Sequence, residues 1–370
     1  MKTKNMLALV TACLTWSCGR PAGSSHVEEI WNKANDPLLL QGDFTRQFAK
    51  LPLTGELPET PWTDTYWPSN LGGIAQRWRH APPDQFSYKT YSEAAVAKLS
   101  LAQLADLSPA EKYDIYEGRF DYPTVARERA RVSAKNAYWE GICHGWAPAA
   151  LNFAEPKPIK LAGASGIQVP FASSDIKALL SYYQGELSAA SSRMLGTRCN
   201  IDLAKFPNAA KTHPECKGIN AGAFHVALVN LVGRDVKGFV ADVSHGNEIW
   251  NQPVYGFRSK VETERAPSPG AAPEATSEVV INTEMDYTKE IDPTWAAVNG
   301  TDDWSGETVM YRYTVELNAR GNIIGGAWLS TELLDFVWTQ ERPEFSGYFA
   351  DVLKVYERAK DTRTVLAEPK

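Results

Sequence analysis

The spacing of apolar and polar positions predicts helices mainly in the first half of the chain. Ser108-Pro109-Ala110-Glu111 combines a capping serine, a proline at the first helical position and an early acid, which is typical of a helix start. Ser173-Ser174-Asp175 caps a second run, in which apolar residues recur on one face. We expect helices over 92–99, 108–116, 123–136, 173–183 and 345–358.

Runs rich in β-branched and aromatic residues dominate the second half. The strongest lies in 221–243, where two such runs flank a turn-like segment and predict a β-hairpin. His225 would then lie on the first strand and Asp242 on the returning strand. Further strands are expected over 159–161, 167–171, 278–287, 308–317 and 323–330. This mixture of helices and antiparallel strands indicates an α+β fold.

The segment from Tyr138 to Ala150 sets a cysteine beside two tryptophans and a histidine. Gly141 allows a sharp turn before Cys143, and Pro148 suits the first turn of a helix, where its missing N–H would be unpaired anyway. We expect a buried turn with the thiol at or near a helix start, where a thiolate is stabilised by N–H groups and the helix dipole. The alternative is a small apolar cysteine packed under two tryptophans.

The first residues are predicted to be a targeting segment. Lys2 and Lys4 precede a short apolar run from Met6 to Trp16, which is too short to span a membrane. Ser17-Cys18-Gly19 then resembles a bacterial lipoprotein signal. Residues 1–18 are therefore expected to be the signal and Cys18 the lipidated residue, with Cys13 as the alternative.

The remaining cysteines support that choice. Cys199 and Cys216 lie 17 residues apart in a loop-like stretch and are the natural disulfide in an oxidising compartment. If Cys18 carries lipid, Cys13 leaves with the signal and Cys143 is the one odd thiol. We expect an exported protein, either a lipoprotein of the cell envelope or a secreted one.

Composition narrows the class of protein. The 370 residues are 44% hydrophobic with a formal net charge of −6, and no block of Lys and Arg is long enough to bind a phosphate backbone. Residues 19–60 are interpreted as a tether and N-terminal extension, and residues 61–370 as the main α+β domain. A Pro- and Ala-rich stretch at about 262–277 is expected to be a mobile loop.

Chemistry enters when Cys143, His225 and Asp242 are considered together. A histidine base near the thiol forms a thiolate–imidazolium pair, and an acid behind the histidine fixes its tautomer. This order, on a helix followed by two neighbouring strands, is that of the transglutaminase-like superfamily. A hydrogen-bonded core histidine and a turn acid are the other interpretation.

Two further histidines are alternatives for the base. His144 follows the thiol directly, so on a helix its side chain is expected to point elsewhere. His245 lies in a loop and is expected to line the site or cap the turn.

Four segments are similar to motifs of the oomycete transglutaminase elicitors and their bacterial relatives: Gly141–Ala149, Phe239–Val243, Ile249–Phe257 and Asn322–Trp328. The third resembles the surface peptide that plant cells recognise, with Trp250-Asn251-Gln252-Pro253 at its centre. Two positions depart from the family's pattern. Tyr255 replaces an expected basic residue, and Ala327 replaces an expected acid.

The resemblance implies a transglutaminase-like, papain-like arrangement, with a nucleophilic Cys143 at a helix start packed against an antiparallel β-sheet. It implies protein-glutamine γ-glutamyltransferase activity, in which the cysteine forms a thioester with a glutamine side chain and an amine then receives the acyl group. Trp139 or Trp146 is expected to supply an oxyanion donor or a pocket wall. The catalytic part would be residues 61–370.

The implied partners are protein substrates that carry glutamine and lysine side chains. Nucleic acid is not expected, and a membrane only through the lipid anchor. The resemblance also raises calcium dependence, but the acids Asp286, Asp292, Asp302 and Asp303 lack the spacing of a binding loop. No cofactor and no metal site is therefore predicted.

Two other functions stay open. A cysteine peptidase, amidase or glutaminase could use the same triad with water as the acceptor. A non-catalytic surface lipoprotein could use the same fold and its many aromatic residues to bind a polymer.

Overall fold

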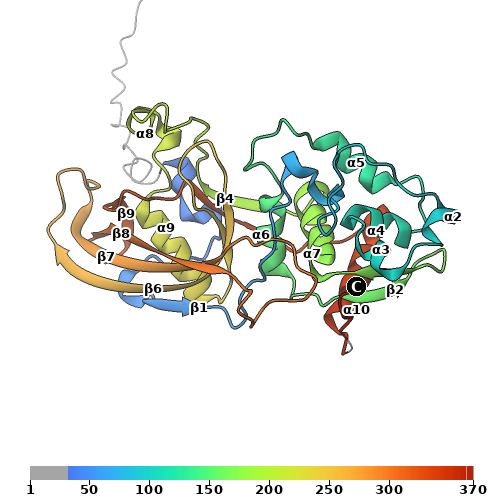
Figure 1. Cartoon of the computed structure of the whole chain (residues 1–370). Helices are drawn as coiled ribbons and strands as arrows, with labels where there is room; N and C mark the ends of the chain where they lie inside the picture. The colour runs from blue at the N-terminus through green and yellow to red at the C-terminus, as the bar shows by residue number, and fades with distance from the viewer. Residues whose placement is uncertain (1–31, 364, 370) are drawn as a thin grey trace, which may run out of the picture.

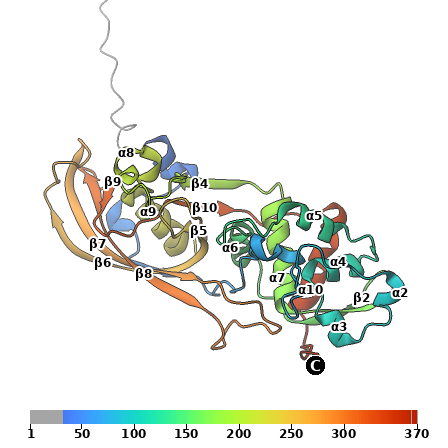
Figure 2. The ribbon, with the colours of Figure 1, turned by 45° about the horizontal axis from the view of Figure 1, so that its top comes forward.

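Two lobes, one built on a curled antiparallel sheet and the other on helices, make up the described part of the chain (Figure 1). The computed structural model describes residues 32–363 and 365–369. Helix α6 (Cys143–Asn152) lies where the lobes meet (Figure 2) and packs against α7 (Ser173–Tyr182) of the helical lobe and β5 (Phe239–Asp242) and β6 (Asn251–Arg265) of the sheet. The predicted mixture of helices and antiparallel strands is confirmed.

The main sheet runs in the order β4-β10-β5-β6-β7-β8-β9, and every neighbouring pair is antiparallel. Its long central strands curl around an apolar core (Figure 2), which contains Phe224, Tyr311 and Tyr313. The strands are β4 (Ser192–Gly196), β5 (Phe239–Asp242), β6 (Asn251–Arg265), β7 (Ala275–Thr288), β8 (Gly306–Asn318), β9 (Ile323–Trp328) and β10 (Phe336–Gln340).

The predicted hairpin over 221–243 is wrong in its first half. Residues Ala221–Leu228 form helix α9, which Asn220 caps by accepting from the main-chain N–H groups of residues 222 and 223, and a π-helical turn, Val229–Arg234, follows. The returning strand is confirmed as β5. An unbroken apolar run is equally consistent with a buried strand and a buried helix. In the structure, α9 packs against β8 and β9 inside the curl of the sheet (Figure 1).

Residues 33–60, interpreted above as part of an extension, belong to the sheet lobe. Short 3-10 turns at Lys33–Asn35, Pro37–Leu39 and Phe48–Lys50 lead into β1 (Thr54–Glu56), which pairs with β6. Leu40, Phe44 and Leu51 are buried in the core of this lobe. These residues are therefore part of the folded sheet lobe, and Trp62 and Trp67, which follow them, lie in the core of the helical lobe. The predicted signal at 1–18 and Cys18 lie outside the described residues.

The Pro- and Ala-rich stretch is shorter than predicted. Strand β6 extends to Arg265 and β7 begins at Ala275, so the connecting loop is residues 266–274. Regular pairing of Arg265 with Glu278 across the two strands explains the difference.

The helical lobe contains α2 (Glu93–Val96), α3 (Leu101–Ala105), α4 (Pro109–Tyr116), α5 (Pro123–Arg131), α7 (Ser173–Tyr182) and α10 (Ala350–Lys360), with the hairpin β2 (Ile159–Ala162) and β3 (Gln168–Phe171) beside them. Helix α4 begins as predicted, since Ser108 and Glu111 form a reciprocal capping box. Lys112 of α4 and Asp175 of α7 form an ion pair of 2.6 Å with neither side chain exposed. This pair ties the two helices together.

Candidate active site

Helix α6 begins at Cys143, which confirms the predicted helix start. The main-chain oxygen of Ile142 accepts from the N–H groups of Gly145 and Trp146 at 2.9 and 2.8 Å. The position of Gly141, ahead of the helix, requires a glycine because a Cβ there would lie 2.3 Å from the main-chain oxygen of Tyr66. The prediction for Pro148 is wrong, because it lies inside α6 and not in the first turn.

The thiol of Cys143 lies at the floor of a cleft of about 400 Å³ between the two lobes. Cys143 is 5% exposed, and among the described cysteines it is the one outside a disulfide. Its Sγ lies 3.7 Å from the main-chain oxygen of Ile249 and 3.5 Å from the side-chain nitrogen of Asn251. One helix start from the helical lobe and one strand start from the sheet therefore meet at the sulfur.

His144 lies beside the thiol, contrary to the prediction that it points elsewhere. The Cα–Cβ bonds of a helix tilt toward its N-terminus, so in the first turn both side chains extend past the helix end into the cleft, where no preceding turn separates them. Nε2 of His144 lies 3.2 Å from Oε1 of Glu186. Partial burial opposes the charged imidazole, but hydrogen bonds and negative charge from Cys143 and Glu186 outweigh it and raise the pKa of His144 to about 9.

Glu186 is a residue that the sequence did not reveal. It lies in a single π-helical turn, Tyr183–Leu187, that continues α7, a feature frequent at functional sites. Burial would raise its pKa, yet the hydrogen bond to His144 and the charges of Arg131 and His144 lower it. The carboxylate is therefore ionised at neutral pH and suited to hold an imidazolium.

A close approach of two glycines brings these groups together. A Cβ on Gly185 would lie 2.8 Å from the Cα of Gly145 and 3.0 Å from the ring of His144. Real Cβ atoms are not found so near backbone atoms, so the π turn reaches the start of α6 because both positions lack a side chain.

His225, the predicted base, lies elsewhere. Its side chain is fully buried in the core of the sheet lobe, where Nδ1 bonds to the hydroxyl of Tyr313 at 2.8 Å and the ring packs beside Phe48. Burial lowers its pKa to about 3. No contact between His225 and Cys143 is found in the described part of the chain. The physical reason is that the residue lies on α9 inside the curl of the sheet and not on a strand at the cleft.

Asp242, the predicted acid, does not orient a histidine either. One of its oxygens, Oδ1, accepts from the hydroxyl and N–H of Ser244 and from the N–H of Trp250. Burial raises its pKa to about 6. The carboxyl group instead fixes the turn from β5 into β6, so it shapes the strand start that faces Cys143. The structure thus does not bring Cys143, His225 and Asp242 together.

The other residues predicted to line the pocket lie in different environments. Trp139 lines the cleft with His144. Trp146 is fully buried one turn into α6, and its indole N–H has no hydrogen-bond partner among the described residues. His245 bonds to the main-chain oxygen of Cys216 at 2.8 Å and lies away from the thiol, against the disulfide loop.

Of the segment Trp250-Asn251-Gln252-Pro253, Asn251 lines the cleft, and β6 begins at this residue. The ring of Trp250 meets Tyr66 edge-on at 5.3 Å and its N–H donates to Glu248. Asn251 faces the thiol, while Gln252 points the other way and donates to Glu290 at 2.8 Å. Pro253 pairs with Val240 of β5.

The profile of the transglutaminase elicitors matches residues 39–358. The chain belongs to the transglutaminase elicitor family. The crystal structure of the GP42 transglutaminase from Phytophthora sojae is similar, with a TM-score of 0.60 and 23% identity over 85% of this chain and 94% of that one. At this identity the likeness concerns the fold. No curated protein matches the chain significantly.

The disulfide of this transglutaminase elicitor family member is confirmed between Cys199 and Cys216. It closes a loop that contains α8 (Ala209–Thr212) and fits a protein exported to an oxidising compartment. Arg198, directly before the bridge, lines the cleft of Cys143. The loop therefore also fixes part of the cleft's rim.

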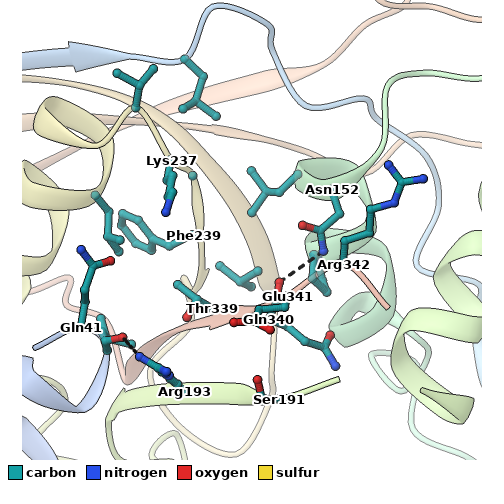
Figure 3. A pocket seen from close by; sticks show the side chains of 18 of the residues that line it. Gln41, Asn152, Ser191, Arg193, Lys237, Phe239, Thr339, Gln340, Glu341 and Arg342 are labelled. Atoms are coloured by element: carbon teal, nitrogen blue, oxygen red, sulfur yellow. Dashed lines mark hydrogen bonds between the residues drawn. The ribbon is translucent and has the colours of Figure 1, made fainter. Parts of the chain in front are cut away.

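A second cavity of about 590 Å³ lies at the opposite end of α6 (Figure 3). Gln41 and Arg193 lie on one side of it and Asn152 on the other, where its amide donates to the main-chain oxygen of Gln340 at 3.2 Å. Its lining contains no cysteine or histidine.

Within the described residues, no group of three or more His, Cys, Asp or Glu side chains could hold a metal ion. The helices of the same residues are too short or too polar to cross a membrane.

Proposed function

We propose that the protein is a protein-glutamine γ-glutamyltransferase that uses Cys143 as nucleophile, His144 as proton carrier and Glu186 as the acid that orients the imidazole. The observation that carries the proposal is the contact sequence thiol, imidazole, carboxylate in one cleft. Nucleophile, base and orienting acid in contact are the arrangement that thiol acyl transfer requires.

In the first half-reaction, the thiolate attacks the carbon of a glutamine γ-carboxamide. The C–S bond forms and the carbonyl electron pair moves to oxygen. Protonated His144 then gives its proton to the nitrogen, the C–N bond breaks, the carbonyl re-forms and ammonia leaves. The product is a thioester on Cys143 and a neutral imidazole.

In the second half-reaction, a lysine amine attacks the thioester carbon. Neutral His144 takes the proton of the amine, the C–S bond breaks and an isopeptide bond remains. The thiolate and the imidazolium are restored, and Glu186 stabilises the positive ring at both ends of the cycle. Nε2 is held by Glu186, which leaves Nδ1 for the thiol and the reacting nitrogen.

The substrates in this proposal are protein side chains that enter the cleft from solvent. Glu140 and Glu186 lie beside Arg131 and Arg198 along its walls, so the rim offers both signs of charge. Neither half-reaction as written uses a metal ion. The disulfide supports export, and we propose attachment to the cell envelope through a lipid on Cys18.

The test uses soluble protein from residue 19 onward beside a Cys143→Ala variant. Ammonia release from a glutamine donor peptide is followed with and without a fluorescent primary amine. Ammonia release with amine incorporation, both lost in the variant, is the expected result. Release without incorporation would move the function to a hydrolase. Equal silence of both proteins would remove the enzymatic proposal and favour a binding module.

A further inference from the structure

The side-chain amide of Asn251 is held in one orientation. Its Oδ1 accepts from the indole N–H of Trp338 at 2.8 Å. Because an indole N–H can only donate, the amide oxygen must face Trp338. The NH₂ group is therefore left to point at Sγ of Cys143, from which it lies 3.5 Å away.

The backbone around Asn251 is fixed as firmly as the side chain. Asn251 is the first residue of β6 and lies opposite Asp242 in the ladder, while Asp242 accepts from the N–H of Trp250 at 3.0 Å. Trp338 stands on β10, on the far side of β5 from β6, and pairs with Val240 of β5. Asn251 is 3% exposed. A donor so placed needs no reorganisation when charge develops beside it.

The geometry points to Asn251 as the side-chain donor of the oxyanion hole, an inference that rests on the proposed function. When Sγ bonds to the amide carbon, the carbonyl pair moves to an oxygen that is separated from the sulfur by that carbon alone. The Nδ2 group that reaches the sulfur also reaches this oxygen. The hydrogen bond from Nδ2 to this oxygen weakens again when the carbonyl re-forms and ammonia leaves.

The main-chain N–H of Cys143 supplies a second donor. As the first residue of α6 it has no acceptor within the helix. Helix and strand thus approach the reacting carbon from the two lobes. On the sheet side, Asn251 is the catalytic residue that donates to the oxyanion. Trp338 is a positioning residue that acts through Asn251.

The experiment measures kcat and KM for ammonia release together with the rate at which iodoacetamide alkylates Cys143. Alkylation needs the thiolate but forms no oxyanion. Asn251→Ala is expected to lower kcat by about 10²–10³-fold, with KM and the alkylation rate little changed. Asn230→Ala is the matched control, because it removes a fully buried amide that bonds to the main chain of Thr45 and Val226, away from the cleft.

Two further variants keep the test sharp. Asn251→Asp preserves the shape and the bond from Trp338 but offers no N–H, so it should lose at least as much kcat, and it serves if the alanine variant does not fold. Trp338→Phe removes the indole N–H that fixes the amide, together with part of the ring. It should lower kcat by less than Asn251→Ala and leave KM unchanged.

An unchanged kcat in folded Asn251→Ala, or a loss of kcat matched by an equal loss of alkylation, would overturn the inference. The second result would show that Asn251 only stabilises the thiolate. These outcomes differ from a failure of the proposed function, in which the wild-type protein itself releases no ammonia or Cys143→Ala still does.

Discussion

Nε2 of His144 and Oε1 of Glu186 lie 3.2 Å apart, and this contact joins the start of α6 to the π turn after α7. It gives the histidine next to Cys143 the carboxylate that the proposed catalytic imidazole needs. The acid comes from the helical lobe that also carries the thiol, while the strand wall of the sheet lobe supplies Asn251.

Replacing Glu186 with glutamine should move the alkaline limit of the reaction. Ammonia can leave only while His144 is protonated, so acylation should fall as the pH rises through about 9, the raised pKa of His144. Glu186 helps to raise that pKa, so in Glu186→Gln the fall should begin at a lower pH. The measurement is kcat/KM for ammonia release against pH. Superimposable profiles for both proteins would contradict this role of Glu186.

Adding a methyl group at Gly185 should separate His144 from Glu186. The new Cβ would lie 2.8 Å from Gly145 Cα, so α6 and the π turn must move apart. We expect Gly185→Ala to lose about 1–3 kcal/mol in the free energy of unfolding and most of its activity. Urea unfolding and ammonia release are the measurements. Gly270→Ala, with open space around its Cβ in the loop 266–274, is the control. Wild-type activity in Gly185→Ala would show that the close approach is not required.

The bridge between Cys199 and Cys216 should stabilise the fold through the unfolded chain. Closing a loop of 17 residues contributes about 3 kcal/mol to the free energy of unfolding. The double variant Cys199→Ser, Cys216→Ser should lose about that much, as measured by urea unfolding. Reductant should weaken the wild-type protein and leave the double variant unaffected. Equal stability of the two proteins would mean that the bridge has no such role.

Lys112 should be far more costly to replace than a surface lysine. Its ion pair with Asp175 is fully buried, so Lys112→Met leaves an unpaired buried carboxylate and should cost about 3–5 kcal/mol. Lys354→Met breaks a surface pair with Asp351 and should change the free energy of unfolding very little, because solvent screens such pairs. Activity per folded molecule should persist in both. Similar unfolding midpoints for the two variants would refute the argument.

Local signals in the sequence were sufficient for much of the fold. The capping box at Ser108, the strands β7 to β9 and the disulfide rest on caps, alternation and cysteine spacing, which act over short distances. The start of α6 at Cys143 was also predictable, because Gly141 marks the turn before it.

The predictions were wrong where tertiary packing, and not the local sequence, determines the structure. The apolar run around His225 suits a buried helix as well as a strand, and only its position inside the curled sheet favours α9. The side chains of adjacent residues point in different directions along a helix. In the first turn, however, no preceding turn separates them, so His144 can lie beside Cys143. The sequence around Glu186 did not indicate its role, because its position beside His144 depends on a π turn and on the close approach of Gly145 and Gly185.

The most direct test of the account compares His144→Gln with His225→Gln. Initial rates of ammonia release from a glutamine donor are divided by the concentration of folded protein, which urea unfolding supplies. The account predicts that His144→Gln loses nearly all activity while His225→Gln keeps the wild-type rate per folded molecule. Retained activity in His144→Gln, together with loss in folded His225→Gln, would contradict it.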